Sequence, residues 1–207
     1  MSKKTFFGMS FVVTSFIGLV VGLFFYIPSD PTFRPWSNYF CDVASGPIGG
    51  IIAVGIGLGL AALSLAMLHI TIAKDLRKKS DQKFLISLYL VTGILSTITL
   101  LILGIFPLNP TMPTAFKIHS LVAIFYWTFY GVSFISLGIL EYSNTKIASI
   151  FVILGGFFAL FFAVGFPLQE NGIIVKNAFV YLSMWSAFFL VVLWVIIKIV
   201  KYWRKSV

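Results

Sequence analysis

The polar residues that could carry out chemistry are few, and their positions bring them together. His119, Tyr126 and Tyr130 follow one another at helical spacing, so they share one face of a helix. Asn177 and Tyr181 do the same in a later segment. Three polar residues of the connecting segments are expected at the same depth as these side chains, namely Asp42, Asn109 and Glu170.

This cluster admits three interpretations, which the sequence leaves open. Asp42 could act with His119 as an acid/base pair, since a carboxylate and an imidazole can both move protons near neutral pH. The cluster could instead bind the polar headgroup of a lipid, or it could be a structural network that ties connecting segments to helix ends. An enzyme needs His119 within hydrogen-bond reach of an acidic group, directly or through one water, in an open cavity.

No metal or cofactor is expected. The two histidines, His69 and His119, fall near opposite membrane faces, so they cannot share one haem or one zinc ion. Motifs for a catalytic serine or a phosphate-binding loop are absent from the sequence. The single cysteine, Cys41, is predicted to be an inert interfacial residue. Glu141 is interpreted as an interfacial charge that reaches toward water from the end of a helix.

Long apolar segments must position these residues. The chain has 207 residues, of which 59% are apolar and 10% charged, a composition that excludes a water-soluble domain. Glycines four residues apart, Gly18 with Gly22, Gly46 with Gly50 and Gly55 with Gly59, predict close packing of helices, which is favoured within the monomer over dimerisation. Since a helix needs about 20 apolar residues to cross a bilayer, the sequence predicts an all-α integral membrane bundle, a single domain over 1–207, with six transmembrane helices at about 6–26, 47–73, 84–104, 116–140, 147–165 and 175–197.

The charges predict the orientation of this bundle. The formal net charge is +9, from 15 Lys and Arg against 6 Asp and Glu. By the positive-inside rule, the side that carries most Lys and Arg faces the cytoplasm, so both termini are expected there and the protein in the cell membrane. The excess charge therefore reports orientation, and no nucleic acid partner is expected. Twelve basic residues fall at the termini or in the even-numbered connections: Lys3, Lys4, Lys74, Arg77, Lys78, Lys79, Lys83, Lys146, Lys198, Lys201, Arg204 and Lys205.

The connections on the extracytoplasmic side begin at prolines. Pro28, Pro107 and Pro167 lie at the ends of three apolar segments, and because proline disfavours helix, each helix is expected to stop there. The connection between the first two helices is the longest and is rich in aromatic residues. It could lie in the headgroup layer as an aromatic cap, or it could fold back over the bundle and close a pocket.

Short motifs at the helix ends resemble a known family. These motifs are Asp42-Val-Ala-Ser45-Gly46 before the second helix, Gly104-Ile-Phe-Pro107-Leu-Asn109-Pro110 after the third, and His119-Ser120 in the fourth. With a final helix that opens near Asn177 and passes Trp185, the pattern resembles the DUF998 family of six-helix membrane proteins and, more distantly, the Frag1/DRAM/Sfk1 group. The resemblance implies a six-helix bundle with Asp42 and His119 as neighbours on its outer side. It implies nothing about activity.

The functional expectation follows from the lack of a complete catalytic set. A lipid-binding protein, or an accessory subunit of a membrane complex, is favoured, with membrane lipids or other membrane subunits as partners. The alternative is a membrane enzyme that acts on a lipid or isoprenoid headgroup at the extracytoplasmic face. In that case His119 and Asp42 would be the acid/base pair.

Overall fold

The computed structural model describes residues 3–106, 113–143 and 145–203, and in these ranges it is built from helices. Six helices of the described ranges are long and apolar enough to cross a membrane, which confirms the predicted all-α, six-helix fold. They are α1 (Lys3–Tyr26), α2 (Ile48–Leu76), α3 (Lys83–Ile105), α4 (Pro113–Glu141), α5 (Lys146–Glu170) and α6 (Ala178–Trp203), and a short 3-10 helix, η1 (Phe40–Ser45), precedes α2.

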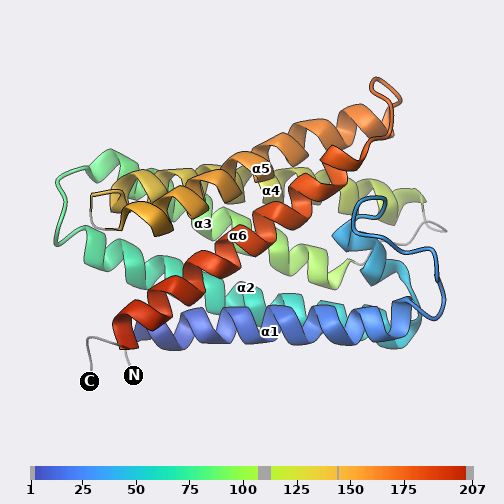
Figure 1. The fold of residues 1–207 in the computed structure, drawn as a ribbon, viewed down its shortest axis with the longest axis horizontal. Coiled ribbons are helices and arrows are strands. Elements are labelled where there is room, and N and C mark those ends of the chain that lie inside the picture. Colours follow the sequence, from blue (N-terminus) through green and yellow to red (C-terminus); the bar gives the residue numbers. More distant parts are fainter. Residues whose placement is uncertain (1–2, 107–112, 144, 204–207) are drawn as a thin grey trace.

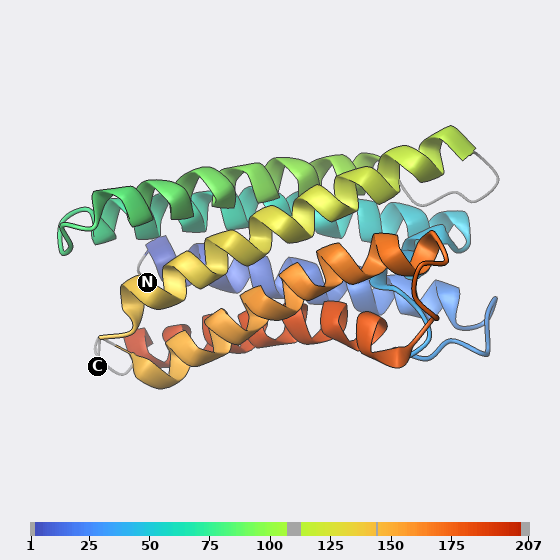
Figure 2. The same ribbon diagram turned by 90° about the horizontal axis from the view of Figure 1, so that it is seen from above.

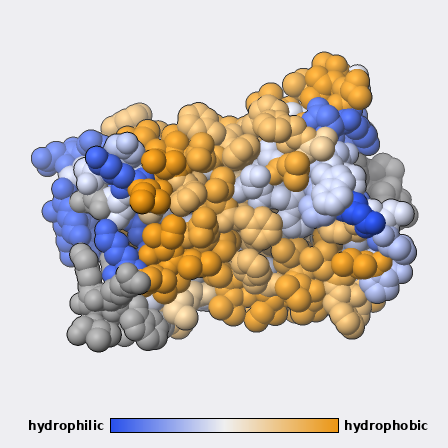
Figure 3. All heavy atoms as spheres, in the orientation of Figure 1, coloured by the Kyte–Doolittle hydropathy of each residue, from blue (hydrophilic) through white to orange (hydrophobic). Residues whose placement is uncertain are grey.

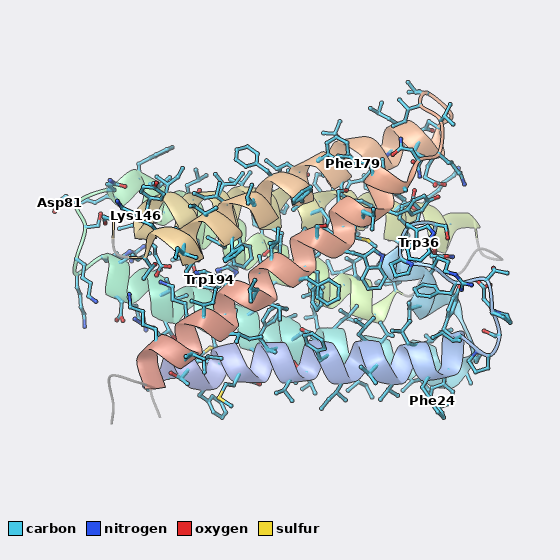
Figure 4. All side chains as sticks on the ribbon, in the orientation of Figure 1. Phe24, Trp36, Asp81, Lys146, Phe179 and Trp194 are labelled. Carbon is cyan, nitrogen blue, oxygen red and sulfur yellow. The ribbon has the colours of Figure 1, made fainter. Side chains whose placement is uncertain are left out.

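The helices pack in chain order. Each helix lies against the next one, and α1 also touches α6, which crosses the bundle diagonally (Figures 1 and 2). Both chain termini lie at one end of the bundle (Figure 1). We call this end, where Asp81 and Lys146 also lie, the terminal end, and the opposite end, which holds η1 and Trp36, the cavity end (Figure 4).

An apolar belt lies between these two ends. Figure 3 shows apolar residues over the middle of the face that it draws and hydrophilic residues gathered toward the ends. Exposed large apolar side chains come from all six helices, among them Phe24 of α1 and Phe179 of α6, which project from the bundle and are 74% and 53% exposed. Trp194 instead points into the bundle and is 2% exposed (Figure 4). Large apolar side chains on the outer surface are unfavourable in water and favourable in lipid.

Glycines allow the helix backbones to approach one another closely. A Cβ atom at Gly18 would lie 2.9 Å from the Cα atom of Gly57, so α1 and α2 can cross here only without side chains. A Cβ atom at Gly55 would likewise lie 2.7 Å from the carbonyl oxygen of Gly104 in α3. The predicted role of Gly18 and Gly55 in packing within the monomer is confirmed.

Two of the three prolines end their helices as predicted, and one does not. α1 stops before Pro28 and α3 stops before Pro107, but α5 continues through Pro167 to Glu170, so the predicted stop there is wrong. The extra turn is stabilised because the Pro167 carbonyl oxygen accepts hydrogen bonds from the backbone N–H of Asn171 at 3.0 Å and from its side-chain amide at 2.8 Å. The helix ends where Gly172 adopts a φ of +71°, a left-handed conformation that favours glycine.

The long connection between α1 and α2 folds back over the cavity end. Its 3-10 helix η1 buries Val43 completely, and the preceding Tyr39 is only 9% exposed. The Tyr39 ring packs edge-on against Phe166 of α5, with ring centroids 5.1 Å apart, and lies 4.5 Å from the ring of Tyr181 in α6. Of the two alternatives for this segment, the structure therefore has the one in which it covers the bundle.

Candidate functional site

A cavity of about 240 Å³ lies beneath the folded connection at the cavity end. We call it the polar cavity. Its walls come from four parts of the chain: the η1 region, α4, α5 with the segment that follows it, and α6. Side chains that can form hydrogen bonds or carry charge line it, namely Ser37, Tyr39, Cys41, Asp42, His119, Glu170, Lys176 and Tyr181.

Asp42 is positioned by the short helix that contains it. Its Oδ2 atom accepts a hydrogen bond of 2.7 Å from the backbone N–H of Tyr39, the residue before η1, and so satisfies a donor at the start of that helix. Burial raises the pKa of Asp42 to about 6, and the nearby carboxylates of Glu170 and Asp30 act in the same direction. Asp42 can therefore gain or lose a proton close to neutral pH.

His119 lies on the face of α4 that lines the polar cavity, and it is 3% exposed. Its Nδ1 atom lies 2.7 Å from the carbonyl oxygen of Phe106, at the end of α3. Because a carbonyl oxygen can only accept, Nδ1 carries the proton and donates it. The other ring nitrogen, Nε2, has no hydrogen-bond partner within the described ranges. In the neutral ring, Nε2 is a buried, unsatisfied acceptor.

A second cavity, of about 50 Å³, adjoins the first. Apolar side chains from α1, α2, α3 and α6 form most of its wall, among them Phe11, Leu58 and Phe188, and Tyr126 of α4 completes it. We call it the apolar cavity. Cys41 and His119 line both cavities, so a polar space and an apolar space meet at these two residues.

A buried amide fastens the connection between α1 and α2 to the far side of the bundle. Gln169, which is 2% exposed, donates a hydrogen bond of 2.7 Å from Nε2 to the Tyr39 hydroxyl. That hydroxyl donates in turn to Glu170 Oε1 at 3.1 Å, and Gln169 Oε1 accepts from the backbone N–H of Asn177 at 3.1 Å. At the residue before Tyr39, the indole N–H of Trp185 donates to the Asn38 carbonyl oxygen at 3.2 Å.

The structure brings four of the predicted site residues around one cavity. Asp42, His119, Glu170 and Tyr181 all line the polar cavity. Asp42 and His119 share it without a direct hydrogen bond, since Nδ1 is bonded to Phe106 and Nε2 is without a partner within the described ranges. Proton exchange between Asp42 and His119 therefore requires a water molecule or a ligand group that bridges the two side chains.

The other predicted site residues lie elsewhere. Tyr126 faces the apolar cavity, and Tyr130 is buried in the core, 1% exposed, against Phe134. Asn177 caps α6, because its Oδ1 accepts the backbone N–H groups of Phe179 and Val180 at 3.1 and 3.2 Å. Asn109 falls outside the described residues. The predicted binding roles of these residues stay predictions.

Tyr39 and Gln169 were not among the residues predicted for the site. The signal for Gln169 was an amide that follows Phe-Pro-Leu in the sequence, and it was outweighed by the expectation that α5 ends at Pro167. The signal for Tyr39 was its place in an aromatic-rich connection. Neither signal shows that the two side chains meet across 130 residues of chain.

Cys41 and the acidic groups offer little for metal binding or nucleophilic chemistry. Burial raises the pKa of the Cys41 thiol to about 12, and the carboxylate of Asp42 adds to this shift, so the reactive thiolate is scarce. No group of three His, Cys, Asp or Glu side chains in the described part of the chain is placed to hold a metal ion.

The environment of Glu141, at the terminal end, differs from the prediction that this residue is an interfacial charge reaching toward water. Glu141 Oε2 lies 2.7 Å from Lys198 Nζ, and the two side chains are only 13% and 11% exposed. Lys198 also donates to Thr145 Oγ1 at 3.0 Å. Glu141 therefore belongs to a largely buried ion pair between α4 and α6, because the α6 helix continues beyond its predicted end and brings Lys198 to it.

His69 is buried in the core between α2 and α3. It is 1% exposed, and its Nδ1 atom lies 2.9 Å from the hydroxyl of Tyr89 in α3. His119 belongs to α4 and lines both the polar and the apolar cavity, and His69 is not among the residues that line these two cavities.

Comparisons of the chain with protein-family models, with curated proteins and with solved structures find no match. The resemblance to the DUF998 family stays a prediction.

Proposed function

We propose that this multi-pass membrane protein binds an amphiphilic lipid at the cavity end. The headgroup would occupy the polar cavity, and the start of an acyl or isoprenoid chain would enter the apolar cavity. The observation that carries this proposal is the wall shared by the two cavities at Cys41 and His119. A site for a lipid needs adjoining polar and apolar spaces, and concave sites of this kind are where proteins usually bind small molecules.

In the proposed orientation both termini lie in the cytoplasm of a cell, and the cavity faces the other side of the cell membrane. The support is the concentration of Lys and Arg at the termini and in the connections of the terminal end. A single cysteine introduced at the exposed Ser37 or the exposed Ser143, in a Cys41→Ser background, tests it. A membrane-impermeant maleimide should label position 37 and not position 143 in intact cells, and the reverse pattern would reject this orientation.

The lipid proposal is tested by filling the polar cavity. Ala123 is 3% exposed in its wall, so Ala123→Phe would place a ring in the space meant for the headgroup. We expect native mass spectrometry of the purified protein to show bound lipid for the wild type and little for this variant. Leu121→Phe is the matched control, because Leu121 is on the same helix but 55% exposed on the outer surface.

The outcomes of this experiment separate the functions expected from the sequence. Bound lipid that is lost in Ala123→Phe and kept in Leu121→Phe supports lipid binding in the cavity. Equal amounts of lipid on both variants would place the lipid on the outer surface and reject the proposal. Bound protein subunits without any bound lipid would reject it in favour of an accessory role.

Acid/base catalysis on the bound headgroup is the second candidate. Two features favour it: the pKa of Asp42 near 6, and the buried, unpartnered Nε2 atom of His119, a residue that lines the same cavity. His119 Nε2 would accept a proton from a substrate hydroxyl or water, and Asp42 would donate one. The test is incubation with a lipid extract that contains phospholipids and isoprenoid phosphates, followed by mass spectrometry of the lipids. A new lipid product that disappears in His119→Gln, with lipid binding retained, would establish this activity.

A further inference from the structure

The groups that line the polar cavity are mainly acceptors. Asp42 and Glu170 are carboxylic acids, and the His119 Nε2 atom is an unpartnered acceptor that is buried in the wall. The Tyr39 hydroxyl donates its hydrogen to Glu170 and so leaves none for a ligand. The wall is therefore suited to a ligand that brings hydrogen-bond donors.

The net charge of the cavity wall also favours a ligand that brings hydrogen-bond donors. Lys176 is the basic residue among those that line the cavity in the described structure, and its side chain is 67% exposed. Its Nζ atom lies 3.9 Å from Glu170 Oε1, so it offsets one of the two carboxylates from the mouth of the cavity. When both carboxyl groups are ionised, the lining groups carry a net negative charge, which disfavours an anionic headgroup.

Aromatic rings form the wall beside Glu170. Tyr39 lies at the centre of this group, with ring centroids 5.8 Å from Phe162, 5.1 Å from Phe166 and 4.5 Å from Tyr181. All four residues line the polar cavity. The faces of aromatic rings attract cations, and several rings around one space are the arrangement by which proteins recognise organic ammonium groups.

We propose that the polar cavity selects a ligand that carries an organic ammonium group, held by the carboxylates of Asp42 and Glu170 and by the surrounding aromatic rings. This inference rests on the proposed function, because the ammonium group would be the headgroup of the bound lipid. A phosphate-only or sugar-only headgroup would meet carboxylates where it needs donors.

The experiment compares lipids with the same acyl chains. The full-length protein in detergent is mixed with equal amounts of dioleoyl phosphatidylethanolamine and dioleoyl phosphatidylglycerol, and bound lipid is counted by native mass spectrometry. We expect the amine lipid to exceed the anionic one by about tenfold, since two partly exposed carboxylates and several aromatic rings together supply about 1.4 kcal/mol of discrimination.

Variants assign this preference to the cavity. Glu170→Gln keeps an acceptor for the Tyr39 hydroxyl while it removes the charge, so it should fold and lower the preference to about twofold or less. Lys176→Gln should raise the preference, because it removes the opposing charge. Asp30→Asn is the matched control: it removes a carboxylate at the same end of the bundle, in the connection between α1 and α2 but outside the cavity wall, and should leave the preference unchanged.

Soluble amines distinguish the source of the ammonium group. Displacement of the lipid by millimolar ethanolamine or tetramethylammonium would support recognition of the ammonium group alone, and a preference that survives these amines would support recognition of the whole lipid. Equal or stronger binding of phosphatidylglycerol, or a preference unchanged in Glu170→Gln, would overturn the inference. Lipid binding that is lost in Ala123→Phe would then still support the proposed function, so the two failures are distinguishable.

Discussion

The two ends of the bundle bury polar groups in opposite ways. At the terminal end, Glu141 and Lys198 neutralise each other at 2.7 Å, and the space beside them is about 20 Å³, room for little more than a water molecule. At the cavity end, Asp42, Glu170 and His119 line a space of about 240 Å³. Opposite charges in contact form a structural ion pair, whereas two carboxylic acids beside a cavity of this size can also contact a ligand.

This difference separates stability from binding. Substitutions at the terminal end should lower the free energy of unfolding without changing ligand preference. Substitutions at the cavity end should change ligand preference without lowering the free energy of unfolding. The exceptions are the residues that hold the connection between α1 and α2 against α5 and α6. The following variants test that separation, in order of decreasing expected effect on stability.

Glu141→Ala should have the largest effect. It leaves the Lys198 ammonium largely buried without its carboxylate, and such a loss typically costs about 3–5 kcal/mol. We expect a clear fall in the thermal unfolding midpoint in detergent, with unchanged lipid preference in the protein that remains folded. Asp81→Ala, an exposed acidic residue at the same end, is the control and should change neither property. A lipid preference altered by Glu141→Ala would show that the two ends are coupled.

Tyr39→Phe should have an intermediate effect. It keeps the ring but removes the hydroxyl that links Gln169 to Glu170, so the buried Gln169 amide loses its acceptor, at a cost of about 1–3 kcal/mol. Hydrogen exchange should become faster in residues 37–45, since they are no longer fastened to α5. Tyr142→Phe, at an exposed position of the terminal end, provides the comparison. Unchanged exchange in 37–45 would mean that ring packing alone holds the segment.

Asp42→Asn should have a smaller effect that depends on pH. The pKa of Asp42 is raised from 3.8 to about 6 in the folded protein, so the folded state holds this proton more tightly than the unfolded state does. The ionised carboxylate therefore destabilises the fold, fully above pH 6 and progressively less as the pH falls toward 4.

We expect Asp42→Asn to stabilise the protein at pH 7.5 by on the order of 1 kcal/mol, because Asp42 is partly exposed, and to give no gain near pH 4. Thermal unfolding at the two pH values measures this. The other ionisable groups near Asp42, namely His119, Glu170, Lys176 and Asp30, are present in both proteins, so the difference between the proteins reports Asp42 together with its interactions with these groups. An equal gain at both pH values would assign the effect to packing.

Chemical modification of Cys41 should have the smallest effect on stability, because the protein carries no substitution before the thiol reacts. Because burial raises the pKa of this thiol to about 12, N-ethylmaleimide at pH 8 should react at least about a hundredfold more slowly than with a cysteine introduced at the exposed Ser37. Mass spectrometry over a time course gives both rates. Similar rates would show that the cavity opens often enough to expose its wall.

The sequence was sufficient to predict the six helices because the thickness of a bilayer requires about 20 apolar residues in each. The same reasoning placed Asp42, His119, Glu170 and Tyr181 at one end, since depth in a membrane follows from position along a helix. It failed where a contact depends on the paths of distant segments. Helix α5 passes Pro167 because the Asn171 amide and Gly172 complete an additional turn, and Lys198 reaches Glu141 from a helix 57 positions later.

The connection between α1 and α2 is held by helices to which it is not joined in sequence. Its own ends belong to α1 and α2, but Tyr39 and Asn38 are bonded to α5 and α6. The part of the cavity wall that this connection forms can therefore move only when several contacts to α5 and α6 break together. We expect Tyr39→Phe, which removes the hydroxyl from these contacts, to shorten the residence time of a bound ligand more than it lowers the equilibrium affinity.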